Sequence, residues 1–127
     1  MDDAALLAAF EASTLAPDEF NHQNHVRAAW LFLRREPLAP AAHRFAATLQ
    51  VYVMKLGAQA KFHLTLTLAF MHLIHDRMRE GESWTQFHAR NPELFANAAA
   101  LIAQHYSAPQ LAAGRSQFAE PDRATLP

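Results

Sequence analysis

Prolines and glycines divide this chain into stretches of helical length. Pro17, Pro37 and Pro92 interrupt runs that are rich in alanine and leucine, and Gly57 and Gly81 end two others. Proline lacks the backbone donor that a helix needs, and glycine adopts the left-handed conformation in which many helices end. This punctuation predicts helices over residues 2–13, 22–36, 40–56, 61–80, 84–89 and 93–106, with a last turn over 107–114.

Helical stretches along the whole chain of 127 residues predict an all-α fold. A chain of this length buries enough apolar surface for one core, and it contains no internal repeat and no flexible linker. We therefore expect a single domain over residues 1–127, a compact bundle of about five to six helices. Residues 115–127 contain two prolines, and we expect them to form an extended tail on the surface.

One segment also fits a β-strand. Polar and apolar residues alternate strictly over residues 63–68, which is the period of a strand, and residues 51–53 are strand-like as well. A loop at Gly57 would join the two in a hairpin. We favour helices across residues 49–70, because the run continues to residue 80 without a turn signal and an isolated hairpin lacks a partner face.

Charge and composition exclude several classes of protein. The 11 basic side chains nearly cancel the 12 acidic ones, so the chain lacks the positive charge with which proteins bind nucleic acid or anionic membranes. No apolar run reaches the roughly 18 residues of a membrane span. The absence of cysteine excludes disulfides and thiolate ligands. Asp2 and Asp3 stand where a secretory signal would be basic, so we expect a cytoplasmic protein.

The unusual feature of the composition is eight histidines in 127 residues. His22 and His25 are three residues apart, so on a helix their side chains project from one face about 5–6 Å apart. That spacing allows two imidazoles to bind one ion through bonds of about 2.0–2.1 Å. His63 lies in the first turn of another predicted helix and shares a face with Thr67 and Phe70. His22, His25 and His63 are therefore candidate ligands of one divalent metal: Zn, Cu, Ni or Fe.

A simpler interpretation of these histidines remains open. Histidines at helical spacing occur by chance in a chain this rich in them, and H-x-x-H lacks the glutamate and the four-residue spacing of H-E-x-x-H metalloenzymes. A polar, capped helix end explains His22 and His25 as well. His72 and His75 repeat the spacing beside Asp76, and we expect this second pair to lie on a solvated face.

Three blocks of residues, which follow one another along the chain, together form a distinctive pattern. They are residues 20–30 (FNHQNHVRAAW), residues 61–67 (KFHLTLT) and residues 107–122, which contain SAPQL and RSQFAEPD. The pattern resembles a family of small bacterial proteins with F-N-H-x-x-H, then K-Y-H-E-T-L-T, and an acidic, proline-containing tail. The resemblance covers residues 15–127 and implies that the three histidines belong to one site, but it implies no reaction.

The chain departs from the pattern of that family beside the third histidine. Phe62 and Leu64 stand where the family has tyrosine and glutamate, so a carboxylate is missing there. The residues that remain as a fourth ligand or as partners that orient an imidazole are Asn21, Asn24, Glu19, Glu120 and Asp122.

These residues lead to three hypotheses about function. The first is a metal-dependent enzyme, in which three neutral imidazoles leave a coordination position open for water or a small, partly apolar substrate. Its substrate pocket would be lined by Trp30, Phe62, Thr67, Phe70 and, for an anionic group, Lys61. The second is a non-catalytic helical module that binds a metal or a small ligand, or that senses pH. The third is a structural or dimerising domain that binds a partner through apolar faces, which contain Leu31, Phe32, Tyr52 and Phe95.

Overall fold

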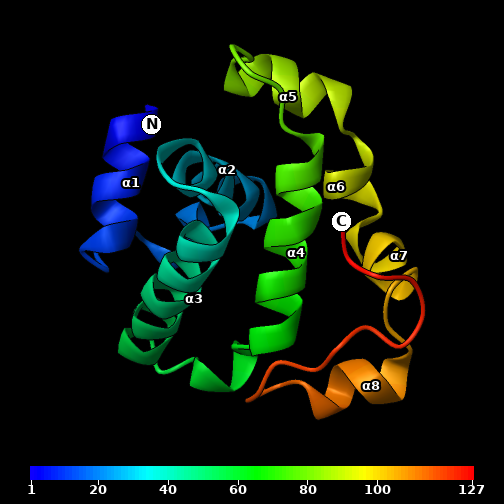
Figure 1. Ribbon diagram of the computed structural model, residues 1–127. Coiled ribbons are helices and arrows are strands. Elements are labelled where there is room, and N and C mark those ends of the chain that lie inside the picture. The colour runs from blue at the N-terminus through cyan, green and yellow to red at the C-terminus, as the bar shows by residue number, and fades with distance from the viewer. The chain divides into compact units, whose positions relative to one another are not determined.

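Every regular element of the chain is helical in the computed structural model, which describes residues 1–127 (Figure 1). The predicted all-α class is confirmed, and residues 49–70 contain no strand. The helices are α1 (Asp3–Glu11), α2 (His22–Arg35), α3 (Leu38–Lys55), α4 (Leu64–Arg77), α5 (Trp84–Arg90), α6 (Glu93–Ala96), α7 (Ala98–Ala103) and α8 (Ala108–Ala113), with 3-10 turns η1 (Pro17–Glu19) and η2 (Gln59–Lys61). None of them has the length and apolar character that crossing a membrane requires.

The chain divides into two compact units, Met1–Phe62 and His63–Pro127. The first unit contains α1, α2 and α3, and each of these helices contacts the other two. The second unit contains α4 to α8, in which α7 contacts both α4 and α6. The single domain expected over residues 1–127 stays a prediction.

An aromatic cluster forms the core of the first unit. Phe10 of α1, Phe32 of α2 and Phe45 of α3 are at most 1% exposed, and their ring centres lie 5.3–6.0 Å apart. Tyr52 is equally buried, and its hydroxyl donates to the carbonyl oxygen of Leu15 at 2.8 Å. Tilted and edge-on ring pairs add to the free energy gained by burial, so these rings join the three helices.

This core explains why the predicted dimer face is wrong for three of its four residues. Leu31, Phe32 and Tyr52 are at most 7% exposed, so they are already buried within the chain. The fourth, Phe95, is half-buried, with its ring centre 4.3 Å from that of His88.

The second unit differs from the expected helices in two places. The helix predicted over residues 61–80 is shorter, because His63 caps α4 from outside and the backbone at Met78 is extended. The helix predicted over residues 93–106 is interrupted at Asn97, whose φ of −131° lies outside the helical region and separates α6 from α7. The chain therefore has eight α-helices, where the punctuation predicted five to six.

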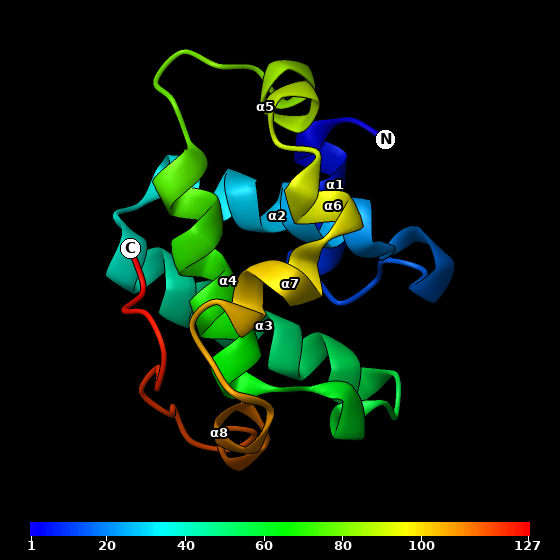
Figure 2. The same cartoon turned by 90° about the vertical axis from the view of Figure 1, so that its right-hand side faces the viewer.

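Residues 115–127 have no regular structure and lead from α8 back along the second unit (Figure 2). The backbone N–H groups of Arg123 and Ala124 donate to the carbonyl oxygens of His105 and Gln104, at 3.0 and 3.2 Å. Backbone hydrogen bonds therefore attach this tail to the residues that follow α7.

Candidate functional site

The first turn of α2 presents two of the three predicted ligands side by side. Asn21 caps the helix, because its side-chain oxygen accepts from the backbone N–H of Asn24 at 2.9 Å. His22 and His25 follow in the first two turns, with ring centres 6.4 Å apart and ring planes inclined by 54°. The helical spacing thus brings the two imidazoles together as the sequence predicts.

His25 is held between aromatic rings of the first unit. Its ring lies almost parallel to Phe20, with centres 5.2 Å apart, and is tilted by 37° against Phe45 at 5.4 Å. Burial, and to a smaller extent the neighbouring His22, lowers the pKa of His25 from 6.5 to about 4. His25 is therefore a neutral imidazole at neutral pH, which is the form that binds a metal ion.

The pair is the part of the predicted site that the structure brings together. Two imidazoles that share an ion through bonds of about 2.0–2.1 Å have ring centres roughly 5–6 Å apart, and those of His22 and His25 are 6.4 Å apart. However, no group of three or more His, Cys, Asp or Glu side chains in the structure is placed to hold a metal ion. The pair alone is assembled.

His63, the third predicted ligand, begins the second unit and serves as the N-cap of α4. Its Nδ1 accepts a hydrogen bond from the backbone N–H of Leu66 at 3.1 Å. A neutral imidazole that accepts at Nδ1 carries its proton on Nε2. In this position His63 offers a ligand an N–H donor, and it binds a metal only after giving up the cap.

The residues predicted to support the histidines have other partners. The side-chain amide of Asn24 donates to the carbonyl oxygen of Glu19 at 2.7 Å, so Asn21 and Asn24 together shape the start of α2. Asp122 accepts from the backbone N–H and the hydroxyl of Ser107, at 2.7 and 2.5 Å. Hydrogen bonds from Ser107 lower the pKa of the Asp122 carboxyl, which is therefore ionised as it joins the tail to α8. Glu120 and Glu19 have exposed side chains.

The five predicted pocket residues divide between the two units. Lys61 is exposed at the end of η2, and Phe62 follows it. Trp30 is 2% exposed, with the guanidinium of Arg34 over its ring at 4.7 Å. In the second unit, Phe70 is 8% exposed and Thr67 is 7% exposed. The Thr67 hydroxyl donates to the carbonyl oxygen of His63 at 2.7 Å, so it supports the start of α4.

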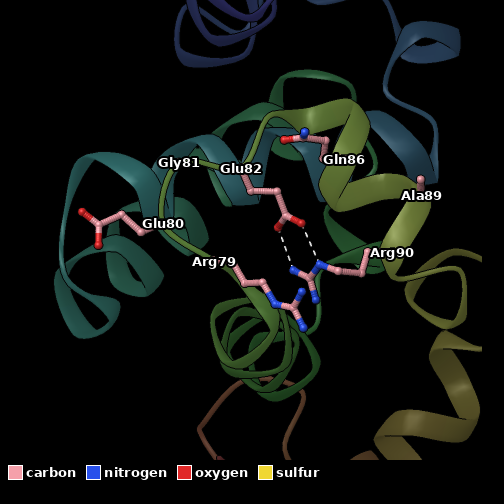
Figure 3. A pocket seen from close by; sticks show the side chains of 7 residues that line it. All are labelled: Arg79, Glu80, Gly81, Glu82, Gln86, Ala89 and Arg90. Atoms are coloured by element: carbon pink, nitrogen blue, oxygen red, sulfur yellow. Dashed lines mark hydrogen bonds and ion pairs between the residues drawn. The ribbon is translucent and has the colours of Figure 1, made fainter.

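A shallow depression in the second unit lies elsewhere, between α4 and α5 (Figure 3). Arg90 binds both carboxylate oxygens of Glu82, at 2.6 and 2.7 Å, and also donates to the carbonyl oxygen of Arg77 at 2.6 Å. The hydrogen bond from Arg90 lowers the pKa of Glu82. The two central charges of the depression therefore neutralise each other and join the loop to α5, and the predicted pocket shares no residue with it.

Thr65 is a buried polar residue of the second unit that the sequence analysis did not single out. It is fully buried on α4. A buried threonine hydroxyl needs hydrogen-bond partners, so a threonine in a core indicates a specific contact. Those partners lie in the tail, more than 50 residues away.

Comparisons with known proteins add no relative to this picture. No family model matches the chain, no curated protein matches its sequence, and no solved structure matches it. The resemblance based on the three blocks of residues therefore stays a prediction.

Proposed function

We propose that the chain binds one divalent transition metal through His22 and His25, with His63 as a third ligand once its ring leaves the cap of α4. The observation that carries the proposal is the pair on α2, whose ring centres lie 6.4 Å apart. Its inner member is kept neutral by burial, since the pKa of His25 is about 4. Neutral imidazoles favour Zn, Cu, Ni or Fe.

A binding module is the better supported form of this proposal. No group of three ligands is assembled in the structure, so the proposal requires that the third ligand joins the site when the metal binds. Such a site responds to metal, as a carrier or a sensor does, and needs no substrate. Catalysis is the second candidate: two or three protein ligands leave coordination positions for water, which a bound metal ion makes more acidic. It would act on a small, partly apolar substrate.

The test is metal analysis of the full chain purified without a histidine tag, followed by calorimetric titration with Zn²⁺, Cu²⁺, Ni²⁺ and Fe²⁺. We expect one ion per chain. The double variant His22→Ala/His25→Ala should bind at least 100-fold more weakly, because each lost imidazole removes a metal–nitrogen bond.

The chain supplies its own matched control for this experiment. His72 and His75 have the same spacing on α4, and the Nδ1 of His72 lies 3.0 Å from the carbonyl oxygen of Pro127. His72→Ala/His75→Ala should leave metal binding unchanged. Equal losses in the two double variants, or no binding by the unaltered chain, would overturn the proposal.

The setting of this function is part of the proposal. We propose a cytoplasmic protein whose partners are small molecules, without nucleic acid or a membrane, and that is able to form a homodimer. The near balance of 11 basic and 12 acidic side chains supports the exclusion of polyanionic partners. For a dimer, Val51 and Met54 of α3 are the apolar side chains left exposed, at 54% and 58%. Light scattering at several concentrations tests the dimer.

A further inference from the structure

The first turn of α4 is completed by the chain's own tail. The first N–H groups of a helix have no partner within the helix. Here the N–H of Leu64 donates to the carbonyl oxygen of Arg115 at 2.9 Å, and the N–H of Thr65 donates to that of Gly114 at 3.1 Å. The Nδ1 of His63 accepts from the next N–H group, that of Leu66. The tail and His63 therefore satisfy neighbouring donors of the same turn.

The side chain of Thr65 binds the tail a second time. Its hydroxyl donates to the carbonyl oxygen of Gln117 at 3.2 Å and accepts from the N–H of Ala119 at 2.9 Å. Thr65 itself is fully buried, and the two hydrogen bonds of its hydroxyl are partly shielded from water. A Cβ added at Gly114 would overlap the Thr65 hydroxyl and lie 2.8 Å from its Cβ. The tail thus approaches Thr65 as closely as a glycine allows.

Further hydrogen bonds continue this attachment along the second unit. The hydroxyl of buried Tyr106 donates to the carbonyl oxygen of Ala119 at 2.8 Å, and Gln110 donates to that of Glu120 at 2.8 Å. The apolar side chain of the segment, Phe118, is 40% exposed. The segment buries no large apolar side chain, and segments held mainly by hydrogen bonds open at lower free energy than an apolar core.

We propose that residues 115–124 act as a clamp which, through Thr65, holds His63 in its capping position. The clamp supports the turn that His63 caps, through Arg115 and the Thr65 hydroxyl, and the bond from Leu66 to His63 exists only while that turn is formed. Opening the clamp loosens the turn and releases Nδ1 of His63, which is then able to bind a metal. Thr65 is a positioning residue in this scheme. Only the consequence for metal binding rests on the proposed function.

Hydrogen exchange in the unaltered full chain tests the clamp without any substitution. The amide of Ala119 reports the bond to Thr65, and the amide of Leu66 reports the bond to His63. We expect both amides to exchange through one opening, with equal protection and equal dependence on low denaturant concentrations. Free exchange of Ala119 while Leu66 stays protected would separate the tail from the cap and overturn the inference.

Three variants identify Thr65 as the residue responsible. Thr65→Val keeps the shape and removes both hydrogen bonds, and we expect Leu66 to exchange about tenfold faster. Thr65→Ser restores the hydroxyl and should restore the protection. Thr48→Val is the control for the same substitution in the other unit, because the Thr48 hydroxyl of α3 donates within its own helix, to the carbonyl oxygen of Arg44. Faster exchange of Leu66 in the control as well would contradict a specific role of Thr65.

Zinc titration of the same variants separates the clamp from the proposed function. If both hold, Thr65→Val binds Zn²⁺ more tightly than the unaltered chain, by up to about tenfold, and Thr65→Ser does not. Faster exchange of Leu66 with unchanged Zn²⁺ affinity keeps the clamp and removes His63 from the metal site. Unchanged exchange of Leu66 in Thr65→Val overturns the clamp, whatever the affinity for Zn²⁺.

Discussion

The N-terminal ends of α2 and α4 both carry a histidine of the predicted site, but they hold it by different forces. On α2, Asn21 is the cap, and His25 is fixed one turn later between the rings of Phe20 and Phe45. On α4, His63 is itself the cap. Stacking occupies the faces of an imidazole, whereas capping occupies one of its nitrogens.

This difference decides what each histidine offers to a ligand. Burial among rings keeps His25 neutral and lowers its pKa to about 4. Capping fixes the proton of His63 on Nε2, which makes the ring a donor. Metal binding therefore requires no change of protonation at His25 of α2, whereas it requires that His63 leave the cap of α4.

The largest effect is expected from removing the aromatic wall of the α2 end. Phe45→Ala leaves a cavity between Phe10, Phe32 and His25, and we expect a loss of about 3–5 kcal/mol in the free energy of unfolding. The pKa of His25 should rise towards 6.5, because its ring becomes hydrated. Chemical denaturation and an NMR titration of His25 measure the two changes.

Val51→Ala is the control on the same helix. Val51 is 54% exposed, so its truncation should change the free energy of unfolding by at most about 0.5 kcal/mol. An unchanged His25 pKa in Phe45→Ala would show that the rings do not keep His25 neutral.

Acid should destabilise the α2 end in a defined range of pH. The unfolded chain protonates His25 near pH 6.5 and the folded chain only near pH 4, so the unfolded state binds more protons between these values. The stability from the half-buried, neutral ring is present above pH 6.5 and is lost as the pH falls to 4. The resulting loss in the free energy of unfolding is at most about 3 kcal/mol.

Urea denaturation at pH 7.0 and pH 4.5 measures this contribution when the chain is compared with His25→Gln. The other titrating groups are common to both proteins, so the difference between their two losses isolates His25. Equal losses in both proteins would mean that His25 is already protonated, or solvated, in the folded state.

At the α4 end, Gly114→Ala should cost about 1–3 kcal/mol by overlap with Thr65. The added methyl group also pushes the tail away, so we expect faster proteolysis after Arg115. In the double variant with Thr65→Ala the overlap with the hydroxyl is relieved. Its loss in the free energy of unfolding should therefore be smaller than the sum of the losses in the two single variants. Strict additivity would show that the two residues do not meet.

The difference between the ends also explains what the sequence predicted and what it did not. The helix over residues 22–36 and its Asn21 cap follow from local signals, and so does the pairing of His22 with His25. The cap of α4 was missed because histidine is an uncommon cap, and the helix was predicted to start at Lys61.

The tail contacts depend on tertiary structure and left no local pattern. Thr65 meets Gln117 across 52 residues of chain, and Asp122 meets Ser107 across 15. In the sequence, Asp122 is simply an acid near a proline, which suggested a metal ligand. Only the folded chain shows that both carboxylate oxygens of Asp122 accept hydrogen bonds from Ser107.

The smallest change in stability is expected where the cap and the ligand role of His63 are separated. His63→Ala removes the acceptor of Leu66 and should cost about 1 kcal/mol with or without a metal, so its melting temperature says nothing about ligation. His63→Asn keeps a good capping oxygen and should leave the free energy of unfolding within about 0.5 kcal/mol. If His63 is a ligand, His63→Asn binds Zn²⁺ at least tenfold more weakly at full stability. If Zn²⁺ affinity is also unchanged, His63 is a cap only, and the difference between the two helix ends is then one of structure alone.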